Sequence, residues 1–167
     1  MNKNVNIAIV GLGQIGIYLY NELIVKKKDI ETKTGKKINI VAISAKNKNK
    51  KRRFKINKKI FYQNPLEIFK KQKIDILFES IGLPDGISKN IVETALKNKI
   101  HVITPNKALI AKHGDYLSLL AKLSNEWKHP KCTVEERNIH YHTQLMFEEK
   151  RRKHCRIKKS KIPYRLI

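Results

Sequence analysis

The sequence predicts an α/β fold: a doubly wound parallel sheet with helices between successive strands. Three observations predict it. Short apolar runs alternate with longer segments that carry apolar residues at helical spacing, as in repeated β-α-β units. The first run, residues 7–10, contains no polar residue, as expected of a parallel strand covered on both faces. A glycine-rich turn of the form G-x-G-x-x-G follows this run and leads directly into a helical pattern.

The first part of the chain predicts one β-α-β unit. After the strand at residues 7–10, apolar residues recur every three or four positions and predict a helix from about residue 14 to 27. Residues 29–37 are polar, and Gly35 marks them as a loop. Residues 38–44 are mostly apolar and predict the second strand, so a helix connects the first two strands.

A strongly basic segment separates this unit from the next strand. Residues 46–59 contain nine lysines and arginines, and we expect an exposed, mobile loop there. Residues 60–62 predict a short strand. Asn64 and Pro65 then begin a helix that runs to about residue 71, because proline fits the first turn of a helix.

The remaining pattern continues the alternation of strands and helices. Residues 74–80 and 100–104 predict two further strands, and residues 88–98 predict the helix between them. A last helix is expected from residue 107 to about residue 124. Alternation of this kind is typical of a parallel sheet in which each helix crosses back to start the next strand.

Four segments follow the C-terminal ends of predicted strands: residues 11–16, 44–46, 80–82 and 104–107. In open parallel sheets ligands bind outside these strand ends, so we expect the four segments to line one crevice. The candidate cofactor-binding residues are Gly11, Leu12, Gly13, Gln14, Ile15, Gly16, Ser44, Ala45, Lys46, Ser80, Ile81, Gly82, Thr104, Asn106 and Lys107.

The glycine turn predicts a Rossmann-like dinucleotide site. Gly11 permits a tight turn, Gly13 lets the backbone approach a pyrophosphate, and Gly16 lets the helix pack closely on the strand. The start of the following helix offers free N–H groups and the positive end of its dipole to the same pyrophosphate. A purely structural turn is the alternative interpretation.

The residues after the second strand bear on the choice between NAD and NADP. In NAD sites an acidic residue here binds the ribose hydroxyls and repels the 2′-phosphate of NADP. This chain has Ser44, Ala45 and Lys46 instead, and a hydroxyl with a cation suits a 2′-phosphate. We therefore favour NADP, with NAD as the alternative. Lys46 also reads as the start of the solvated basic loop.

Lys107 is the candidate catalytic residue. It follows a predicted strand end, where its ammonium group would stand near a substrate oxygen beside the nicotinamide. Negative charge grows on that oxygen when hydride adds to a carbonyl, and a fixed cation or proton donor lowers the barrier. The plainer interpretation is a surface lysine that begins a helix.

Composition narrows the remaining function classes. The formal net charge is +23, which favours anionic partners in general. The cations are spread along the whole chain without an aromatic platform or a nucleic-acid motif, so nucleic-acid binding is the weaker interpretation. No apolar run is long enough for a membrane span, and no signal peptide is recognised, so we expect a cytoplasmic protein without a membrane partner.

The character of the chain changes near Trp127, and we predict two parts: a dinucleotide-binding domain at 1–126 and a basic, poorly structured tail at 127–167. The tail holds both cysteines and four of the six histidines, and it shows no apolar period. An out-of-frame or otherwise aberrant segment is our interpretation, and a metal site is the rival. The rival's ligands would be His129, Cys132, His140, His142, His154 and Cys155. Few of them form the close pairs typical of zinc sites, so no metal is predicted.

Together these motifs resemble the N-terminal, cofactor-binding domain of homoserine dehydrogenase. The resemblance runs from residue 6 to about residue 126, and its matching segments are 11–16, 41–46, 78–82 and 101–111, with His113-Gly114 after them. The segment 101–111 is the most specific. The family usually has Thr-Ala-Asn-Lys where this chain has Thr104-Pro105-Asn106-Lys107, and often a second glycine where Leu83 follows Gly82.

The resemblance implies an NAD(P)-dependent oxidoreductase that interconverts aspartate semialdehyde and homoserine, a step towards threonine and methionine. The family's lysine in the last motif carries over to Lys107 as a catalytic candidate. Its basic residue after the second strand carries over to Lys46.

The family continues after this region into a substrate domain with a Glu-Ala-x-Val-x-Gly-Gly-x-Pro segment, which these 167 residues lack. The main oligomer surface of the family belongs to that domain, so a homo-oligomer is a weaker expectation here. We expect the chain to be the cofactor-binding half of such an enzyme, to bind cofactor weakly and to turn over little or no substrate. An NADP-binding regulatory module without catalysis is the alternative.

Overall fold

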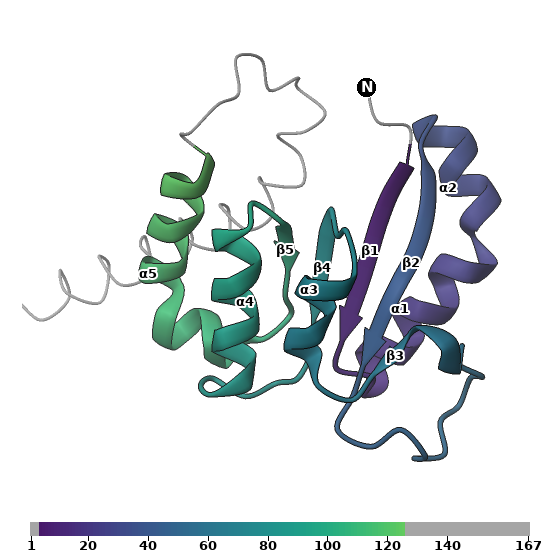
Figure 1. The fold of residues 1–167 in the computed structure, drawn as a ribbon, viewed down its shortest axis with the longest axis horizontal. Coiled ribbons are helices and arrows are strands. Elements are labelled where there is room, and N and C mark those ends of the chain that lie inside the picture. Colours follow the sequence, from purple (N-terminus) through teal and green to yellow (C-terminus); the bar gives the residue numbers. More distant parts are fainter. Residues whose placement is uncertain (1–3, 126–167) are drawn as a thin grey trace, which may run out of the picture. The chain divides into compact units, whose positions relative to one another are not determined.

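The structure is a computed structural model that describes residues 4–125 (Figure 1). Its centre is a parallel sheet with the strand order β3-β2-β1-β4-β5. The strands are β1 (Asn4–Val10), β2 (Lys37–Ser44), β3 (Phe61–Tyr62), β4 (Ile76–Glu79) and β5 (His101–Ile103). After β3 the chain crosses to the other side of β1 and forms β4 there. β1 and β4 therefore flank the switch point, at which open α/β sheets bind ligands. The predicted fold class is confirmed.

Helices cover both faces of the sheet. They are α1 (Gln14–Val25), α2 (Lys27–Thr34), α3 (Ile68–Lys71), α4 (Ile87–Lys97) and α5 (Lys107–Asn125), with short 3₁₀ turns at Lys58–Ile60 and Pro65–Glu67. In β1, Ile7 and Ile9 pack on the α1 side, whereas Ala8 and Val10 pack on the side of α3 and α4. Successive side chains of a strand point to opposite faces, so this one apolar strand serves two cores.

The segment after α1 differs from the sequence prediction. We expected a polar loop over residues 29–37, but α2 occupies Lys27–Thr34 and ends at Gly35, whose φ of +65° closes the helix. Its charged residues pair at i,i+4 spacing, as in the ion pair between Lys33 and Asp29 at 2.9 Å. Such pairs support an exposed helix without an apolar stripe, so apolar periodicity could not reveal it.

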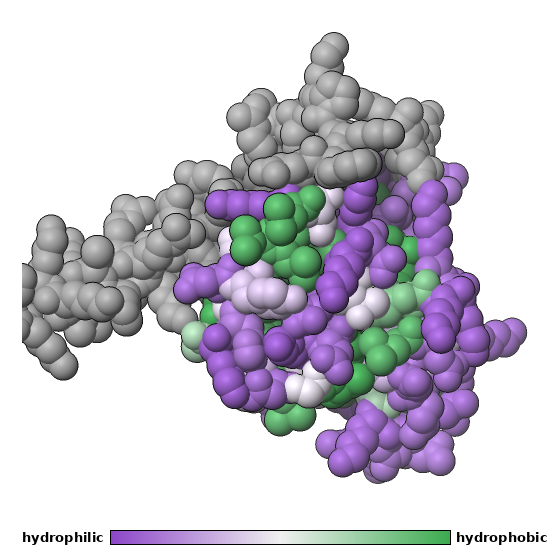
Figure 2. Space-filling model, turned by 60° about the vertical axis from the view of Figure 1, so that its left-hand side comes forward, coloured by the Kyte–Doolittle hydropathy of each residue, from purple (hydrophilic) through white to green (hydrophobic). Residues whose placement is uncertain are grey.

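α5 packs against α4 through a small core of Val92, Leu109 and Leu117. Other apolar side chains of α5 are exposed, among them Tyr116, Leu119 and Leu123. On the face that Figure 2 shows, hydrophilic residues surround and separate the apolar ones.

α5 ends where the described residues end. The predicted domain boundary, the basic tail and its candidate metal ligands therefore lie outside the described residues. None of the helices described within residues 4–125 is both long and apolar enough to cross a membrane.

Candidate cofactor site

Close backbone packing requires two glycines of the turn after β1. Gly11 has a φ of +93°, and a β-carbon there would lie 2.6 Å from the carbonyl carbon of Ser80. A β-carbon on Gly16 would overlap the carbonyl oxygen of Gly11. The Gly11 amide also donates a hydrogen bond to the Ser44 carbonyl, at 2.9 Å. The turn is thus fixed between the ends of β2 and β4.

Gly13 lies in the same turn but is not required by packing. Its backbone is extended, with φ −74° and ψ −159°. Apart from its two neighbours in the chain, no residue in 4–125 has an atom within 4 Å of the position that a β-carbon would take. A side chain would therefore fit the fold at this position. The open space beside the backbone suits a pyrophosphate, which needs close approach at the second glycine of this motif.

α1 begins directly after Gly13 and carries no cap. No side chain within the described residues bonds to its first N–H groups, and its first turn contains no acid. These N–H groups lack partners inside the helix, and the helix dipole adds partial positive charge beside them. Gln14 and Ile15 are exposed here, whereas Leu12 is buried in the core on the α1 side. The start of α1 therefore fits an anion.

At the end of β2 the three predicted residues differ in their accessibility. Ser44 is 1% exposed, so its hydroxyl is not presented at the surface. Ala45 is half-buried and packs against the core. Lys46 is exposed and forms no ion pair with any residue in 4–125. The cation predicted to meet a 2′-phosphate is therefore exposed, and the predicted hydroxyl is not.

The basic segment after Lys46 is an ordered loop. The Arg52 guanidinium donates to the carbonyls of Asn47 at 2.6 Å, Lys50 at 3.0 Å and Lys48 at 3.3 Å, so the loop closes around this one side chain. Further along, the Asn57 amide donates to the hydroxyl of Tyr20 in α1, at 3.0 Å. Phe54 and Ile56 pack against the core on the α1 side.

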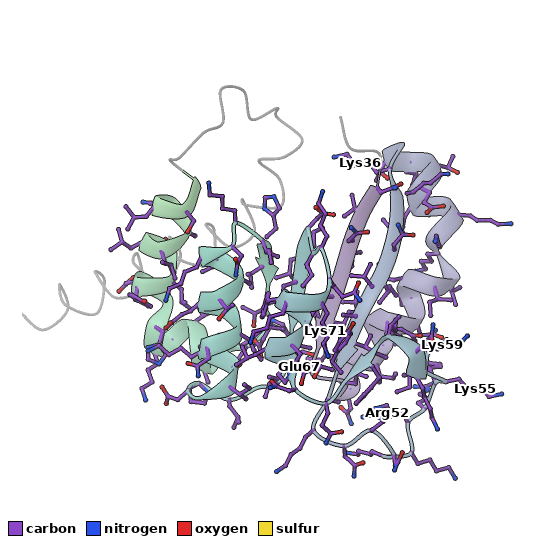
Figure 3. The ribbon with its side chains drawn as sticks, in the orientation of Figure 1. Lys36, Arg52, Lys55, Lys59, Glu67 and Lys71 are labelled. Carbon is purple, nitrogen blue, oxygen red and sulfur yellow. The ribbon has the colours of Figure 1, made fainter. Side chains whose placement is uncertain are left out.

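Figure 3 shows Arg52, Lys55 and Lys59 on one side of the molecule, around the end of β2. Lys36 lies at the opposite end of that strand. A loop is present as predicted, but hydrogen bonds from Arg52 hold it where we expected a mobile segment. Its cations stand at the C-terminal edge of the sheet.

The segment after β4 is joined to the glycine turn. The Ser80 hydroxyl donates to the Gly11 carbonyl at 2.6 Å, and the Ser80 amide donates to the Val10 carbonyl at 2.8 Å. Ile81 is half-buried, and Gly82 is exposed with a φ of +89°. Ser80 therefore holds the glycine turn to the end of β4. Ile81 and Gly82 follow at the same edge of the sheet.

The segment after β5 leads into α5. The Asn106 side chain accepts a hydrogen bond from the Leu109 amide at 3.1 Å, which makes Asn106 the N-cap of α5. The Asn106 amide donates to the Thr104 hydroxyl at 3.0 Å. Lys107 is the first residue of α5; it is exposed and forms no ion pair within the described part of the chain.

Gly13 and Lys107 therefore lie at the same edge of the sheet. Each follows the C-terminal end of a strand, β1 and β5, and only β4 stands between these two parallel strands. In Figure 1 the arrowheads of β1 and β2 point to the lower edge of the view, where the basic loop also lies. The structure thus brings all four predicted segments to one edge, as the strand pattern predicted.

Sequence reasoning missed two polar groups next to this edge. Glu79, the last residue of β4, is fully buried and bonds to both neighbouring loops. Asp85 pairs with Lys112 and lies 2.7 Å from the Nε2 atom of His113 in α5. The hydrogen bonds from Lys112 and then His113 hold the pKa of the Asp85 carboxyl group below its ordinary value. A charged residue closing an otherwise apolar strand was the only signal for Glu79.

Fold and site together define a dinucleotide-binding domain of the Rossmann class: a parallel sheet in the 3-2-1-4-5 order with a glycine turn and an uncapped helix at its switch point. Residues 11–131 match the family model described as "Homoserine dehydrogenase, NAD binding domain". The chain belongs to this family, whose members bind a nicotinamide cofactor in oxidoreductases.

Curated relatives have the same name. The chain is 31% identical over 123 residues to the homoserine dehydrogenase of Neisseria gonorrhoeae and 32% identical over 123 residues to that of Pseudomonas aeruginosa. These alignments cover 74% and 72% of this chain, but only 28% and 27% of the relatives. The chain thus spans little more than a quarter of the length of the curated relatives it matches.

A solved structure agrees with this assignment. The crystal structure of Staphylococcus aureus homoserine dehydrogenase at pH 7.5 is similar with a TM-score of 0.68 and 34% sequence identity. The match covers 73% of this chain and 31% of that one.

Proposed function

We propose that this chain is the NADP-binding part of a homoserine dehydrogenase. Such an enzyme interconverts aspartate semialdehyde and homoserine, on the route to threonine and methionine. The observation that carries the proposal is the pairing of an open Gly13 backbone with an uncapped α1 at the switch point of the sheet. A cytoplasmic location remains a prediction from the sequence.

In this proposal, residues at different strand ends bind different parts of the dinucleotide. Gly13, Gln14 and Ile15 bind the pyrophosphate through the backbone N–H groups at the start of α1, and Gly11 and Gly16 hold that turn in shape. The segments 80–82 and 104–106 border the nicotinamide nucleotide. The bound nicotinamide supplies or accepts the hydride.

In this proposal, Lys107 stabilises the oxygen of the substrate carbonyl group during the reaction. Its ammonium group is exposed at the start of α5 and is not neutralised by an acid within residues 4–125. A free cation there stabilises the negative charge that grows on a carbonyl oxygen during reduction. Asn106 caps the same helix and so fixes the backbone from which Lys107 projects.

Lys46 sets the preference for NADP. It is the exposed cation at the end of β2, the position where an acid would select NAD, and the loop closed by Arg52 adds further cations beside it. A charge-assisted hydrogen bond from Lys46 to a 2′-phosphate favours NADP over NAD.

Calorimetric titration of the 167-residue chain with NADPH and NADH tests both statements. We expect both ligands to bind and NADPH to bind more tightly. Lys46→Ala should weaken NADPH by about tenfold, the size of one charged hydrogen bond, and leave NADH unchanged. Lys36→Ala is the matched control, because it removes an exposed lysine at the opposite end of β2 (Figure 3).

Two outcomes would contradict the proposal at different levels. Binding of neither dinucleotide would overturn the cofactor role itself. Equal loss of NADPH affinity in both lysine variants would overturn the role of Lys46 and indicate a general charge effect. Because the chain spans about a quarter of its curated relatives, we expect it to oxidise little or no homoserine by itself.

A further inference from the structure

A buried carboxyl group joins the two loops on the β4–β5 side of the site. Glu79 is 0% exposed, and its side chain accepts three hydrogen bonds. The Ile81 amide and the Ser88 hydroxyl donate to Oε1 at 2.7 and 2.6 Å, and the Thr104 hydroxyl donates to Oε2 at 2.6 Å. The donors come from the loop after β4, the start of α4 and the loop after β5.

A second layer of hydrogen bonds closes the network through Asn106. The Asn106 side-chain amide donates to the Leu83 carbonyl at 2.7 Å and to the Ser88 hydroxyl at 3.1 Å. Its backbone amide donates to the hydroxyl of Thr104, which itself donates to Glu79. Both loops and the start of α5 are therefore bonded, directly or through one intermediate, to one carboxyl group.

The packing of the fold alone does not call for an acid at this position. Leu77, two residues earlier in the same strand, is also fully buried and fills its place with apolar contacts. Burying a carboxyl group is costly unless hydrogen bonds satisfy it, and replacing a buried polar group by an apolar one is often tolerated. What the network provides is a single arrangement of loops that would otherwise be free to shift.

The place of this arrangement in the sheet indicates what it serves. A doubly wound sheet binds one nucleotide on each side of its switch point. The glycine turn and Lys46 belong to β1 and β2, whereas the loops that Glu79 joins follow β4 and β5. Lys46 is assigned to the 2′-phosphate of the adenosine nucleotide, so the loops after β4 and β5 border the nicotinamide nucleotide.

We propose that Glu79 is a positioning residue for the nicotinamide half of the dinucleotide site. It holds the segments 80–82 and 104–106 in the arrangement that receives the nicotinamide nucleotide, and it acts through them rather than by touching the cofactor. The inference rests on the proposed NADP-binding function.

The experiment compares two ligands on the full chain. NADPH carries both nucleotides, whereas 2′-phospho-ADP-ribose carries the 2′-phosphate and the pyrophosphate but no nicotinamide. Glu79→Gln keeps the size of the side chain but replaces one acceptor oxygen by an NH₂ donor. Either the Thr104 hydroxyl loses its acceptor, or the Ser88 hydroxyl and the Ile81 amide lose theirs. We expect NADPH affinity to fall about tenfold, as for loss of one good hydrogen-bonded contact, while the affinity for the fragment changes less than about twofold.

Two further variants guard against failure of Glu79→Gln to fold. Thr104→Val removes the hydroxyl that bonds to Oε2 at nearly constant volume, and Thr104→Ser restores a hydroxyl. Thr104→Val should reproduce the selective loss of NADPH affinity, and Thr104→Ser should recover it. The fluorescence of the bound reduced nicotinamide should change in Thr104→Val and return in Thr104→Ser.

Asp75→Asn is the matched control. The Asp75 side chain accepts a hydrogen bond from the Asn6 amide at 2.8 Å, just before β4 and at the opposite edge of the sheet from the site. It should change neither ligand's affinity, although it too removes a structural carboxylate.

The outcomes separate this inference from the function on which it rests. If the unmodified chain bound neither ligand, the proposed function would fail and this inference with it. If the chain bound both but Glu79→Gln or Thr104→Val weakened them equally, or weakened neither, only the positioning role would be overturned.

Discussion

The two sides of the candidate site are shaped by different kinds of interaction. On the β1 side, backbone atoms of Gly11, Gly16 and Ser80 touch so closely that no side chain fits at the two glycines. On the β4–β5 side, hydrogen bonds to the Glu79 side chain join the two loops. Close packing tolerates almost no substitution, whereas a hydrogen-bond network fails by degrees.

The first test of this comparison is Gly16→Ala. The added β-carbon would overlap the Gly11 carbonyl oxygen and lie 2.7 Å from the Ser80 hydroxyl oxygen. The Gly11 oxygen belongs to the backbone, so the backbone must shift. We expect a loss of about 3 kcal/mol or more in the free energy of unfolding, at the upper end for overpacking. Urea unfolding followed by circular dichroism measures it, and a variant as stable as the parent would show the turn to be loose.

Gly13→Ala sharpens the comparison within the same turn. The new methyl group enters open space and the backbone need not move, so the free energy of unfolding should change by less than about 1 kcal/mol. The same methyl group should hinder a pyrophosphate and weaken NADPH binding by about tenfold or more, as loss of one contact would. Calorimetry on Gly13→Ala and the parent checks this. Unchanged affinity would mean that the pyrophosphate does not lie beside Gly13.

Asn106→Ala breaks the other side of the site more gently. It removes the cap of α5, leaves the Leu83 carbonyl and the Leu109 amide without these partners, and leaves the Ser88 hydroxyl only its bond to Glu79. We expect the free energy of unfolding to fall by about 1–2 kcal/mol. Asn64→Ala is the matched control, because Asn64 is itself exposed where it caps the half-buried 3₁₀ turn at Pro65–Glu67, and its loss should cost less. Equal losses would show that burial of the Asn106 network adds nothing to its cap.

The same contrast explains what could be predicted from the sequence. Backbone packing produces a pattern that can be recognised in the sequence, because only glycine fits at Gly11 and Gly16 and buried strands are continuously apolar. The order of strands and helices and the four segments at one edge followed from that pattern. Networks of side chains produce no such pattern: Glu79 finds its partners up to 25 positions away, and no local pattern links them.

Three other features escaped prediction for related reasons. α2 is stabilised by ion pairs between exposed side chains, and it has no apolar face from which the helix could be predicted. The loop after β2 is ordered by bonds from Arg52 to carbonyl oxygens, which are present in every residue and so cannot be recognised in a sequence. Ser44 seemed available to a ligand because it ends a strand, yet its burial depends on the turn packed beside it.

The smallest expected effect concerns Asp85, at the outer rim of the β4–β5 side. Lys112 and His113 lower the pKa of its carboxyl group in the folded chain, so folding favours the ionised form. The resulting stabilisation is present above the ordinary pKa of an aspartate, about 3.9, and is lost as the pH falls through the lower pKa of the folded state. Screening by solvent keeps it small, because the Asp85 side chain is 48% exposed.

Asp85→Asn isolates this contribution. The variant should be slightly less stable than the parent at pH 7. The difference should shrink as the pH falls below about 4, towards the lower pKa at which the folded parent's carboxyl group becomes neutral. Urea unfolding of both chains between pH 3 and pH 7 measures the difference directly. A gap that stayed constant over this range would mean that the bonds from Lys112 and His113 do not depend on the charge of Asp85, and that this part of the rim is held by its shape alone.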